Sequence, residues 1–295
     1  NGKSRMKPVR FDYKRPATID EACGLLAGDD NARILAGGQS LIPMLSMRLS
    51  RPSLLIDIAH IPELTAFVET ETHIEIGAMV RQAVAQKSEL VKTHIPLLAK
   101  ALGYVGHPPT RARGTVGGSV AHADPSAEIA LVAATLGAEI TYRVDGTDEI
   151  FDASDFFIGP MLTIAPPTGC LTRLSFAKAP AVCGTGFHEV APRKSDYALA
   201  SAAAQINFAA GSGVTSIHLG IGSVGDFPER LDVDQLCGTP LDDAAIADAV
   251  HAAMQMVETV EDLHATAAYR KRVATELAIR ALRDARDEIS KDLNQ

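Results

Sequence analysis

Two glycine-rich segments hold the residues of this chain that are best suited to bind a ligand. They are Ala36-Gly37-Gly38-Gln39-Ser40 and Thr115-Val116-Gly117-Gly118-Ser119, the latter continuing into Ala121-His122-Ala123-Asp124-Pro125. A residue without Cβ lets the backbone approach phosphate oxygens closely, and successive N–H groups can then point into one concavity. We therefore predict that the segments form two walls around one diphosphate group. The alternative is that each is only a tight turn.

Polar residues beside these segments extend the same hypothesis. Ser40 and Ser119 end the segments, where a hydroxyl donates to phosphate or caps a helix. Neither segment has the Lys of a P-loop or the GxGxxG of a dinucleotide-binding unit. Arg111 and Arg113 precede the second segment, where they either neutralise a diphosphate or lie on the surface. Glu128 either accepts hydrogen bonds from sugar or ribityl hydroxyls or simply favours a helix N-terminus.

Other kinds of chemistry find little support in the spacing of residues. His122 and Asp124 are two positions apart, and Asp124 is predicted to cap a helix, so we expect no proton relay. No GxSxG motif surrounds Ser119 or Ser126. The four cysteines lack CxxC spacing, which argues against a zinc site, an iron–sulfur site or a disulfide framework: Cys23, Cys170, Cys183 and Cys237. We predict no catalytic residue and no metal ligand, and any electron transfer requires a different cofactor.

The elements around the first segment are predicted to form a small α/β unit. Apolar patterns indicate a helix from Ile19, a strand over 32–36, a helix after Ser40 and a strand over 54–58. This order places the first segment between a strand and the N-terminus of a helix. Such a loop is well placed to bind an anion.

The second segment is predicted to lie among further short elements. We expect a strand over 73–78 and helices over 80–90 and 95–102. Asp124 is predicted as the N-cap and Pro125 as the first residue of a helix that ends at Gly137. Periodicity breaks near 178–185, and a separate α+β part follows, with a core that includes 198–210, a strand over 217–224, and helices near 242–257 and 267–285.

The composition is that of an ordinary globular protein and limits the possible partners. The 295 residues are 46% hydrophobic and 22% charged, with a net charge of -8. This charge argues against a general surface for nucleic acid or anionic membrane. No apolar run approaches the ~20 residues of a membrane span, and no secretion signal is evident. We therefore expect a cytoplasmic protein.

Longer motifs in the chain resemble one known family. They are AGGQSLIPMLSMRL, DIAHIPEL, GHPPTRARGTVGGSVAHADPSAE and HATAAYRKRVATELAIRAL, in this order between about Met6 and Arg283. Together they are similar to the FAD-binding medium subunit of molybdenum hydroxylases, the family of xanthine dehydrogenase and carbon monoxide dehydrogenase. The resemblance covers nearly the whole chain.

This resemblance implies an α/β plus α+β fold. Residues 6–180 would form a two-subdomain FAD-binding domain of the vanillyl-alcohol oxidase (PCMH) type, with subdomains of about 6–60 and 61–180. Residues 185–290 would form a C-terminal α+β domain like that of the carbon monoxide dehydrogenase flavoprotein.

The resemblance also implies which residues contact FAD. Both glycine-rich segments would hold the diphosphate through backbone amides, and Glu128 would contact ribityl or sugar hydroxyls. Val105 and Leu171 match apolar positions near the rings, and Tyr197 matches a tyrosine that lies against the flavin. His188 falls where some relatives have Lys. The full implied set is Leu35, Ala36, Gly37, Gly38, Gln39, Ser40, Leu41, Val105, Thr115, Val116, Gly117, Gly118, Ser119, Asp124, Glu128, Leu171, His188 and Tyr197.

The implied function is that of one subunit in a larger oxidoreductase. A large subunit with a molybdenum cofactor would oxidise the substrate, and a small subunit with two [2Fe–2S] clusters would relay electrons to this chain's FAD. An external acceptor would then take them, in what we expect to be a dimer of heterotrimers. The alternatives are a stand-alone flavin oxidase or reductase of the same fold, and an assembly subunit without redox activity. The sequence specifies neither the substrate nor the terminal acceptor.

Overall fold

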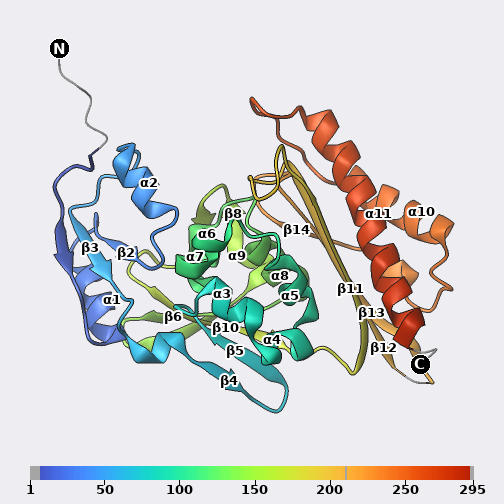
Figure 1. Ribbon diagram of the computed structural model, residues 1–295, viewed down its shortest axis with the longest axis horizontal. Helices are drawn as coiled ribbons and strands as arrows, with labels where there is room; N and C mark the ends of the chain where they lie inside the picture. Colours follow the sequence, from blue (N-terminus) through green and yellow to red (C-terminus); the bar gives the residue numbers. More distant parts are fainter. Residues whose placement is uncertain (1–6, 210, 293–295) are drawn as a thin grey trace.

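A small parallel sheet begins the fold and carries the first glycine-rich segment at its edge. The computed structural model describes residues 7–209 and 211–292 (Figure 1). The central strand β3 (Leu54–Asp57) pairs in parallel with β1 (Asp12–Lys14) and with β2 (Arg33–Leu35). Helices α1 (Ile19–Ala27) and α2 (Leu41–Ser46) lie in the connections. The predicted strand–loop–helix–strand order around the first segment is confirmed.

A five-stranded antiparallel sheet forms the middle of the molecule. Its strands, in spatial order, are β4 (Phe67–Glu69), β5 (His73–Gly77), β10 (Cys170–Ala177), β6 (Glu139–Val144) and β7 (Thr147–Asp152). The shorter elements around it are η1 (Pro62–Thr65), α3 (Gln82–Lys87), α4 (Glu89–His94), α5 (Pro96–Ala101), α6 (Pro108–Arg113), α7 (Val116–His122), α8 (Glu128–Leu136), α9 (Ala153–Phe156), and the hairpin of β8 (Phe157–Gly159) and β9 (Leu162–Thr163). One apolar cluster joins this sheet, its helices and α1.

Two predicted helix boundaries in this region are wrong. The helix expected over 80–90 is divided at Ser88, which ends α3 and caps α4. The helix expected to begin at Asp124 and Pro125 begins at Glu128 instead. The Asp124 carboxylate accepts the Ser126 N–H at 2.8 Å in a tight turn, and the Pro125 carbonyl accepts the Ser223 N–H at 2.9 Å. That carbonyl bonds to another part of the chain, so Pro125 lies before the helix and not within it.

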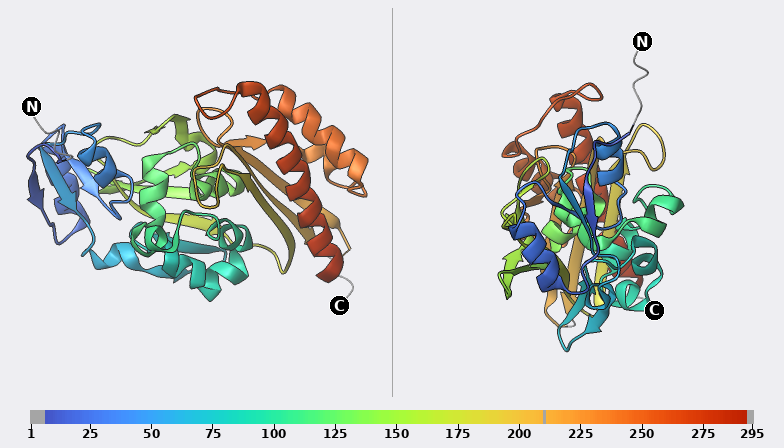
Figure 2. Two further views of the ribbon diagram at one scale, coloured as in Figure 1. Left: turned by 45° about the horizontal axis from the view of Figure 1, so that its top comes forward. Right: turned by 90° about the vertical axis from the view of Figure 1, so that its left-hand side faces the viewer.

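An antiparallel sheet with two helices on one face forms the C-terminal part. Its strands, in order, are β11 (Val182–Val190), β12 (Ala200–Ala209), β13 (Gly213–Gly222) and β14 (Glu229–Leu231), followed by η2 (Asp234–Leu236), α10 (Asp243–Gln255) and α11 (Ala267–Asp292). Helix α11 lies along one face of the sheet, while α5 and α8 pack on the other (Figures 1 and 2). A second apolar cluster fills the space between the sheet, α10 and α11.

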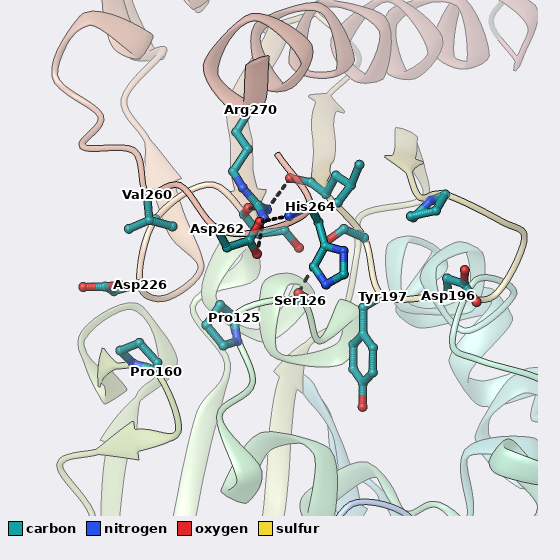
Figure 3. A pocket seen from close by; sticks show the side chains of 15 residues that line it. Pro125, Ser126, Pro160, Asp196, Tyr197, Asp226, Val260, Asp262, His264 and Arg270 are labelled. Carbon is teal, nitrogen blue, oxygen red and sulfur yellow. Dashed lines mark hydrogen bonds and ion pairs between the residues drawn. The ribbon is translucent and has the colours of Figure 1, made fainter. Parts of the chain in front are cut away.

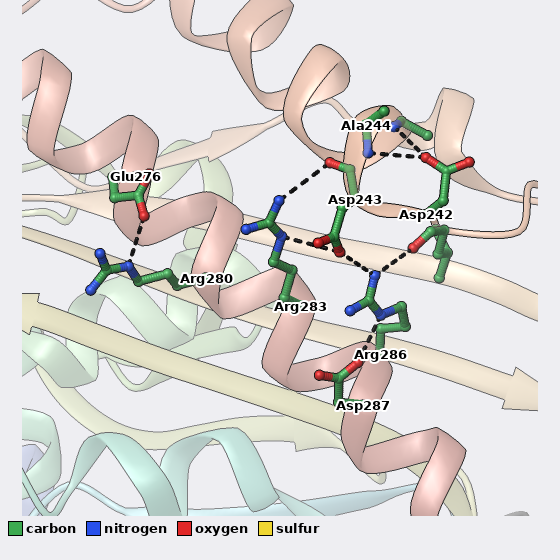
Figure 4. A network of polar contacts seen from close by, with 10 residues as sticks. Asp242, Asp243, Ala244, Glu276, Arg280, Arg283, Arg286 and Asp287 are labelled. Atoms are coloured by element: carbon green, nitrogen blue, oxygen red, sulfur yellow. Dashed lines mark hydrogen bonds and ion pairs between the residues drawn. The ribbon is translucent and has the colours of Figure 1, made fainter.

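Charged residues align α10 with α11 on the outside of this second cluster. Asp243 accepts contacts from Arg283 at 3.3 Å and from Arg286 at 2.7 Å (Figure 4). Asp242 caps α10 by accepting the N–H groups of Ala244 and Ala245. Exposed ion pairs of this kind contribute little free energy, so the buried apolar contacts hold the two helices in place. None of the helices in the described residues is long and apolar enough to cross a membrane.

Candidate functional site

The first glycine-rich segment presents a run of unpaired backbone N–H groups. From Gly37 to Leu41, no backbone N–H donates a hydrogen bond to another group of the described residues. The carbonyls of the same segment are used, because Gly38 accepts from Ile42 at 3.0 Å and Ser40 accepts from Met44 at 3.2 Å. Consecutive free donors next to a helix start are suited to an anionic ligand such as a diphosphate.

The glycines of the first segment are required by packing and by backbone conformation. A Cβ on Gly37 would lie 2.5 Å from the Arg113 carbonyl oxygen and 2.8 Å from Gly114 Cα. Gly38 has a φ of +72°, in the left-handed region that favours glycine. The segment therefore rests directly on the residues that precede the second segment.

The second glycine-rich segment differs from our expectation of a second amide-lined wall. Thr115 caps α7, so the glycines lie in the first helical turn. The Val116 N–H donates to Val80 and the Gly117 N–H donates to Ala78, both at 3.0 Å. The N–H groups of Gly118 and Ser119 donate to the side-chain and backbone oxygens of Thr115. These four amides are satisfied within the protein, so this segment supports the first one and offers a ligand mainly its surface and the Ser119 hydroxyl.

Close packing brings the two segments together. A Cβ on Gly118 would lie 3.3 Å from the Ala36 Cβ, and one on Gly117 would lie 2.6 Å from Ala78 Cα. Arg111 does not reach toward a phosphate, because its guanidinium donates to the carbonyls of Val105 and Gly106 and to the Gln86 side chain. The Arg111 side chain is therefore structural, whereas the Arg113 residue is exposed.

An acidic group lies beyond the C-terminal end of α7. Glu128 is half-buried in the first turn of α8, and within the described residues its carboxylate accepts a hydrogen bond only from its own backbone N–H. Burial, reinforced by the nearby Asp124 carboxylate, raises the pKa of Glu128 to about 7. A carboxylate that accepts a hydrogen bond only from its own backbone N–H keeps lone pairs available for hydrogen bonds from ligand hydroxyls.

A second acid, Glu189, faces the same region and was not among the residues expected from the sequence. Burial and the Glu128 carboxylate raise the pKa of Glu189 to about 8. Its Oε2 atom is buried and has no hydrogen-bond partner. Strand alternation was the available signal, since Gly184 and Gly186 must face a close neighbour and Glu189 then faces the other way.

The same alternation corrects the expectation that His188 faces the cofactor. His188 lies on the face of β11 that packs against α11, and its Nε2 is 2.8 Å from Asp284 Oδ2. A Cβ on Gly186, on that same face, would lie 2.0 Å from the Ala281 carbonyl oxygen. The imidazole therefore points away from Glu128 and from the glycine-rich segments.

The other expected residues lie in three kinds of environment. Val105 and Leu171 are buried in the larger apolar cluster. Leu35 and Leu41, which flank the first segment, are half-buried, and the exposed Gln39 donates to the Gly37 carbonyl at 3.3 Å. Tyr197 is 72% exposed.

Tyr197 lies at the edge of a cavity of about 370 Å³ between the two parts of the molecule (Figure 3). Partial desolvation and the carboxylates of Asp124 and Glu128 raise the pKa of Tyr197, which places the phenol near these acids. On the other side of the cavity, the buried Arg270 donates to the Leu199 and Ser223 carbonyls and pairs with Asp262 at 2.7 Å. In Figure 3 the Tyr197 ring points away from this arginine.

Comparison with known proteins identifies the family. Residues 9–176 match the FAD binding domain in molybdopterin dehydrogenase, and residues 185–285 match the CO dehydrogenase flavoprotein C-terminal domain. The chain belongs to the FAD-binding medium subunits of the molybdenum hydroxylases. It is 34% identical to the nicotine 6-hydroxylase medium subunit of Paenarthrobacter nicotinovorans, over 95% of this chain and 99% of that protein.

Further relatives and a solved structure agree with this assignment. Caffeine dehydrogenase subunit beta from a Pseudomonas species is 32% identical, over 96% of this chain and 97% of that protein. Carbon monoxide dehydrogenase from Hydrogenophaga pseudoflava has a chain that matches with a TM-score of 0.91 and 30% identity, covering 95% of this chain and 99% of its own length.

Membership in the medium-subunit family establishes the general role of the chain. It is the FAD-carrying subunit of a molybdenum-dependent oxidoreductase, and the expected α/β plus α+β fold is confirmed. In homologous complexes the molybdenum cofactor and iron–sulfur clusters belong to partner subunits. All four cysteines are free thiols, and the described residues contain no cluster of three or more His, Cys, Asp or Glu side chains that could hold a metal.

The residues present fit FAD in one specific respect. FAD carries a diphosphate, and within the described residues the backbone N–H groups from Gly37 to Leu41 donate no hydrogen bond. Helix α7, with its seven residues, begins beside the first segment at Gly118 and spans about 10 Å toward Asp124 and Glu128. An elongated dinucleotide requires separate contacts at such a spacing.

Proposed function

We propose that this chain binds the FAD diphosphate on the N–H groups of Gly37 to Leu41 and delivers electrons to an external acceptor. The electrons would come from two [2Fe–2S] clusters in a small partner subunit, after substrate oxidation at the molybdenum cofactor of a large partner subunit. We further propose that two such heterotrimers associate. The observation that carries the proposed site is the run of unpaired donors in the first segment.

The remaining contacts are assigned by the position of each group in the site. The Ser40 and Ser119 hydroxyls lie at the ends of the two segments and would donate to phosphate oxygens. Glu128 would accept hydrogen bonds from ribityl or sugar hydroxyls, because within the described residues its carboxylate accepts a hydrogen bond only from its own backbone N–H. Tyr197 would cover the flavin ring, since it is exposed beside Asp124 and Glu128.

The chemistry of electron transfer belongs to the cofactor. Bound FAD supplies the exchange between one-electron and two-electron transfer that links iron–sulfur clusters to a two-electron acceptor. The chain's own residues bind the cofactor, orient it and limit the access of water. The second glycine-rich segment and the end of α6 before it support the first segment, through close packing of Gly118 on Ala36 and of Gly37 on Arg113.

Substitution of Gly37 tests the proposed diphosphate site. In Gly37→Ala the new Cβ would overlap the Arg113 carbonyl oxygen, so the first segment must move and its N–H groups lose their common direction. We expect at least a hundredfold rise in the Kd for FAD, measured by quenching of flavin fluorescence.

Gly24→Ala is the matched control, because a Cβ at Gly24 in α1 meets nothing within 4 Å. This variant should bind FAD as the unmodified chain does and should retain the same circular dichroism spectrum. Unchanged FAD affinity in a folded Gly37→Ala protein would contradict the assignment of the diphosphate to the first segment.

A further inference from the structure

Arg270, in the first turn of α11, joins three segments of the C-terminal part through one buried guanidinium (Figure 3). Its Nη1 donates to the Leu199 carbonyl at 2.8 Å and to the Ser223 carbonyl at 2.6 Å, and its Nη2 pairs with Asp262 at 2.7 Å. The other carboxylate oxygen of Asp262 accepts two backbone N–H groups of the loop before α11. The guanidinium is therefore oriented by groups from three different segments.

The first of these acceptors, the Leu199 carbonyl, lies at the base of the loop that carries Tyr197. This loop, residues 191–199, joins β11 to β12 and is called the Tyr197 loop below. The Leu199 N–H donates to the Val190 carbonyl at 2.7 Å, so both backbone groups of Leu199 are bonded. Tyr197 is two residues away and largely exposed. Packing supports its side chain little, so its position depends on the base of the loop.

The second acceptor, the Ser223 carbonyl, belongs to the residue that holds the turn before Glu128. The Ser223 N–H donates to the Pro125 carbonyl at 2.9 Å. Ser223 has a φ of +64°, which is uncommon for a residue other than glycine. Such a conformation persists where the surroundings fix it. Here the backbone of Ser223 is bonded to Pro125 on one side and to Arg270 on the other.

The turn before α8 and the Tyr197 loop also contact each other directly. The Ser126 hydroxyl donates to the Ala198 carbonyl at 3.5 Å. Glu128 follows Ser126 by two residues, and Tyr197 immediately precedes Ala198. Both residues proposed to contact FAD on this side therefore lie on backbone segments that Arg270 joins.

We infer that Arg270 is a positioning residue of the FAD site, which holds Tyr197 and the turn before Glu128 in place through the Leu199 and Ser223 carbonyls. A planar guanidinium has several donors in a fixed arrangement, so it can hold two carbonyls and a carboxylate at once. Without it the Tyr197 loop loses one of the two bonds at its base. The inference rests on the proposed function, in which Tyr197 covers the flavin ring and Glu128 contacts FAD hydroxyls.

Substitution of Arg270 should release Tyr197 from the flavin. A phenol against the isoalloxazine ring quenches flavin fluorescence, so the fluorescence of bound FAD should rise several-fold in Arg270→Gln. Arg270→Lys keeps the charge but reaches fewer of the acceptors, so its rise should be smaller. The Kd for FAD should rise about tenfold in Arg270→Gln, as the contact with Glu128 weakens. Arg280→Gln is the matched control on the same helix, where Arg280 pairs with Glu276 at 2.8 Å on the surface, and it should change neither value.

Combination with Tyr197→Ala separates this effect from a general structural role. Tyr197→Ala alone should raise the fluorescence of bound FAD, and addition of Arg270→Gln should then leave the fluorescence unchanged, because both substitutions remove the same contact. A further rise of equal size in the double variant would overturn the inference, as would unchanged fluorescence in the folded single variants of Arg270. Arg270→Lys supplies the same comparison if the glutamine variant does not fold.

Proteolysis of the flavin-free chain gives an independent result that holds even if FAD does not bind. Arg193 and Lys194 lie in the Tyr197 loop, and trypsin cleaves after them only when the loop opens locally. Faster cleavage at these two sites in Arg270→Lys, with other sites unchanged and Arg280→Gln like the unmodified chain, supports the inference. Equal cleavage rates at Arg193 and Lys194 in Arg270→Lys and in the unmodified chain refute it. Failure of the unmodified chain to bind FAD would instead contradict the proposed function.

Discussion

At the residue scale, the glycine-rich segments show what sequence reasoning can and cannot reach. Glycine at 37, 38, 117 and 118 correctly indicated two places of close backbone approach. The close neighbour at Gly37 and Gly117 is other backbone of the same chain, whereas we expected the ligand. Which amides remain free depends on partners such as Val80 and Ala78, far away in sequence, and local composition does not identify them.

The role of Glu128 is also a residue-scale prediction. Glu128→Ala should weaken FAD binding by about 1–3 kcal/mol, because a buried hydrogen-bond acceptor for the ligand is lost. Titration calorimetry with FAD measures this change directly. A Kd equal to that of the unmodified chain would show that the carboxylate serves only the N-terminus of α8.

At the element scale, the sequence predicted which long helices and strands form better than it predicted where they end and which side of a strand each side chain points to. The strand–loop–helix–strand unit and the two C-terminal helices follow from apolar periodicity. The start of α8 was misplaced because Pro125 uses its carbonyl to bind Ser223, a contact between distant segments. The direction of His188 follows from β-strand alternation only once α11 is known to lie against Gly184 and Gly186.

The contact between β11 and α11 gives a prediction for stability. A Cβ in Gly186→Ala would lie 2.0 Å from the Ala281 carbonyl oxygen, so the helix must move away from the sheet. We expect the free energy of unfolding to fall by about 1–3 kcal/mol, the usual cost of overpacking, as measured by urea denaturation. Equal stability of the variant and the unmodified chain would show that the helix and sheet tolerate a wider spacing.

At the whole-molecule scale, two apolar clusters divide the chain and meet where Glu128, Glu189 and Tyr197 lie. Lys100 and Glu288 link the two parts at 2.8 Å, and the Tyr104–Phe187 contact lies nearby. The family and fold could be predicted from the motifs, since these extend over nearly the whole sequence. The relative orientation of the two parts could not be predicted from the sequence, because it depends on contacts such as the hydrogen bond between the Ser223 N–H and the Pro125 carbonyl.

The visible absorption spectrum of the purified chain, with identification of the flavin released on denaturation, tests the central claim most directly. We predict the bands of oxidised flavin and release of FAD, either as purified or after FAD is added. A colourless, folded chain that does not bind added FAD would contradict the account.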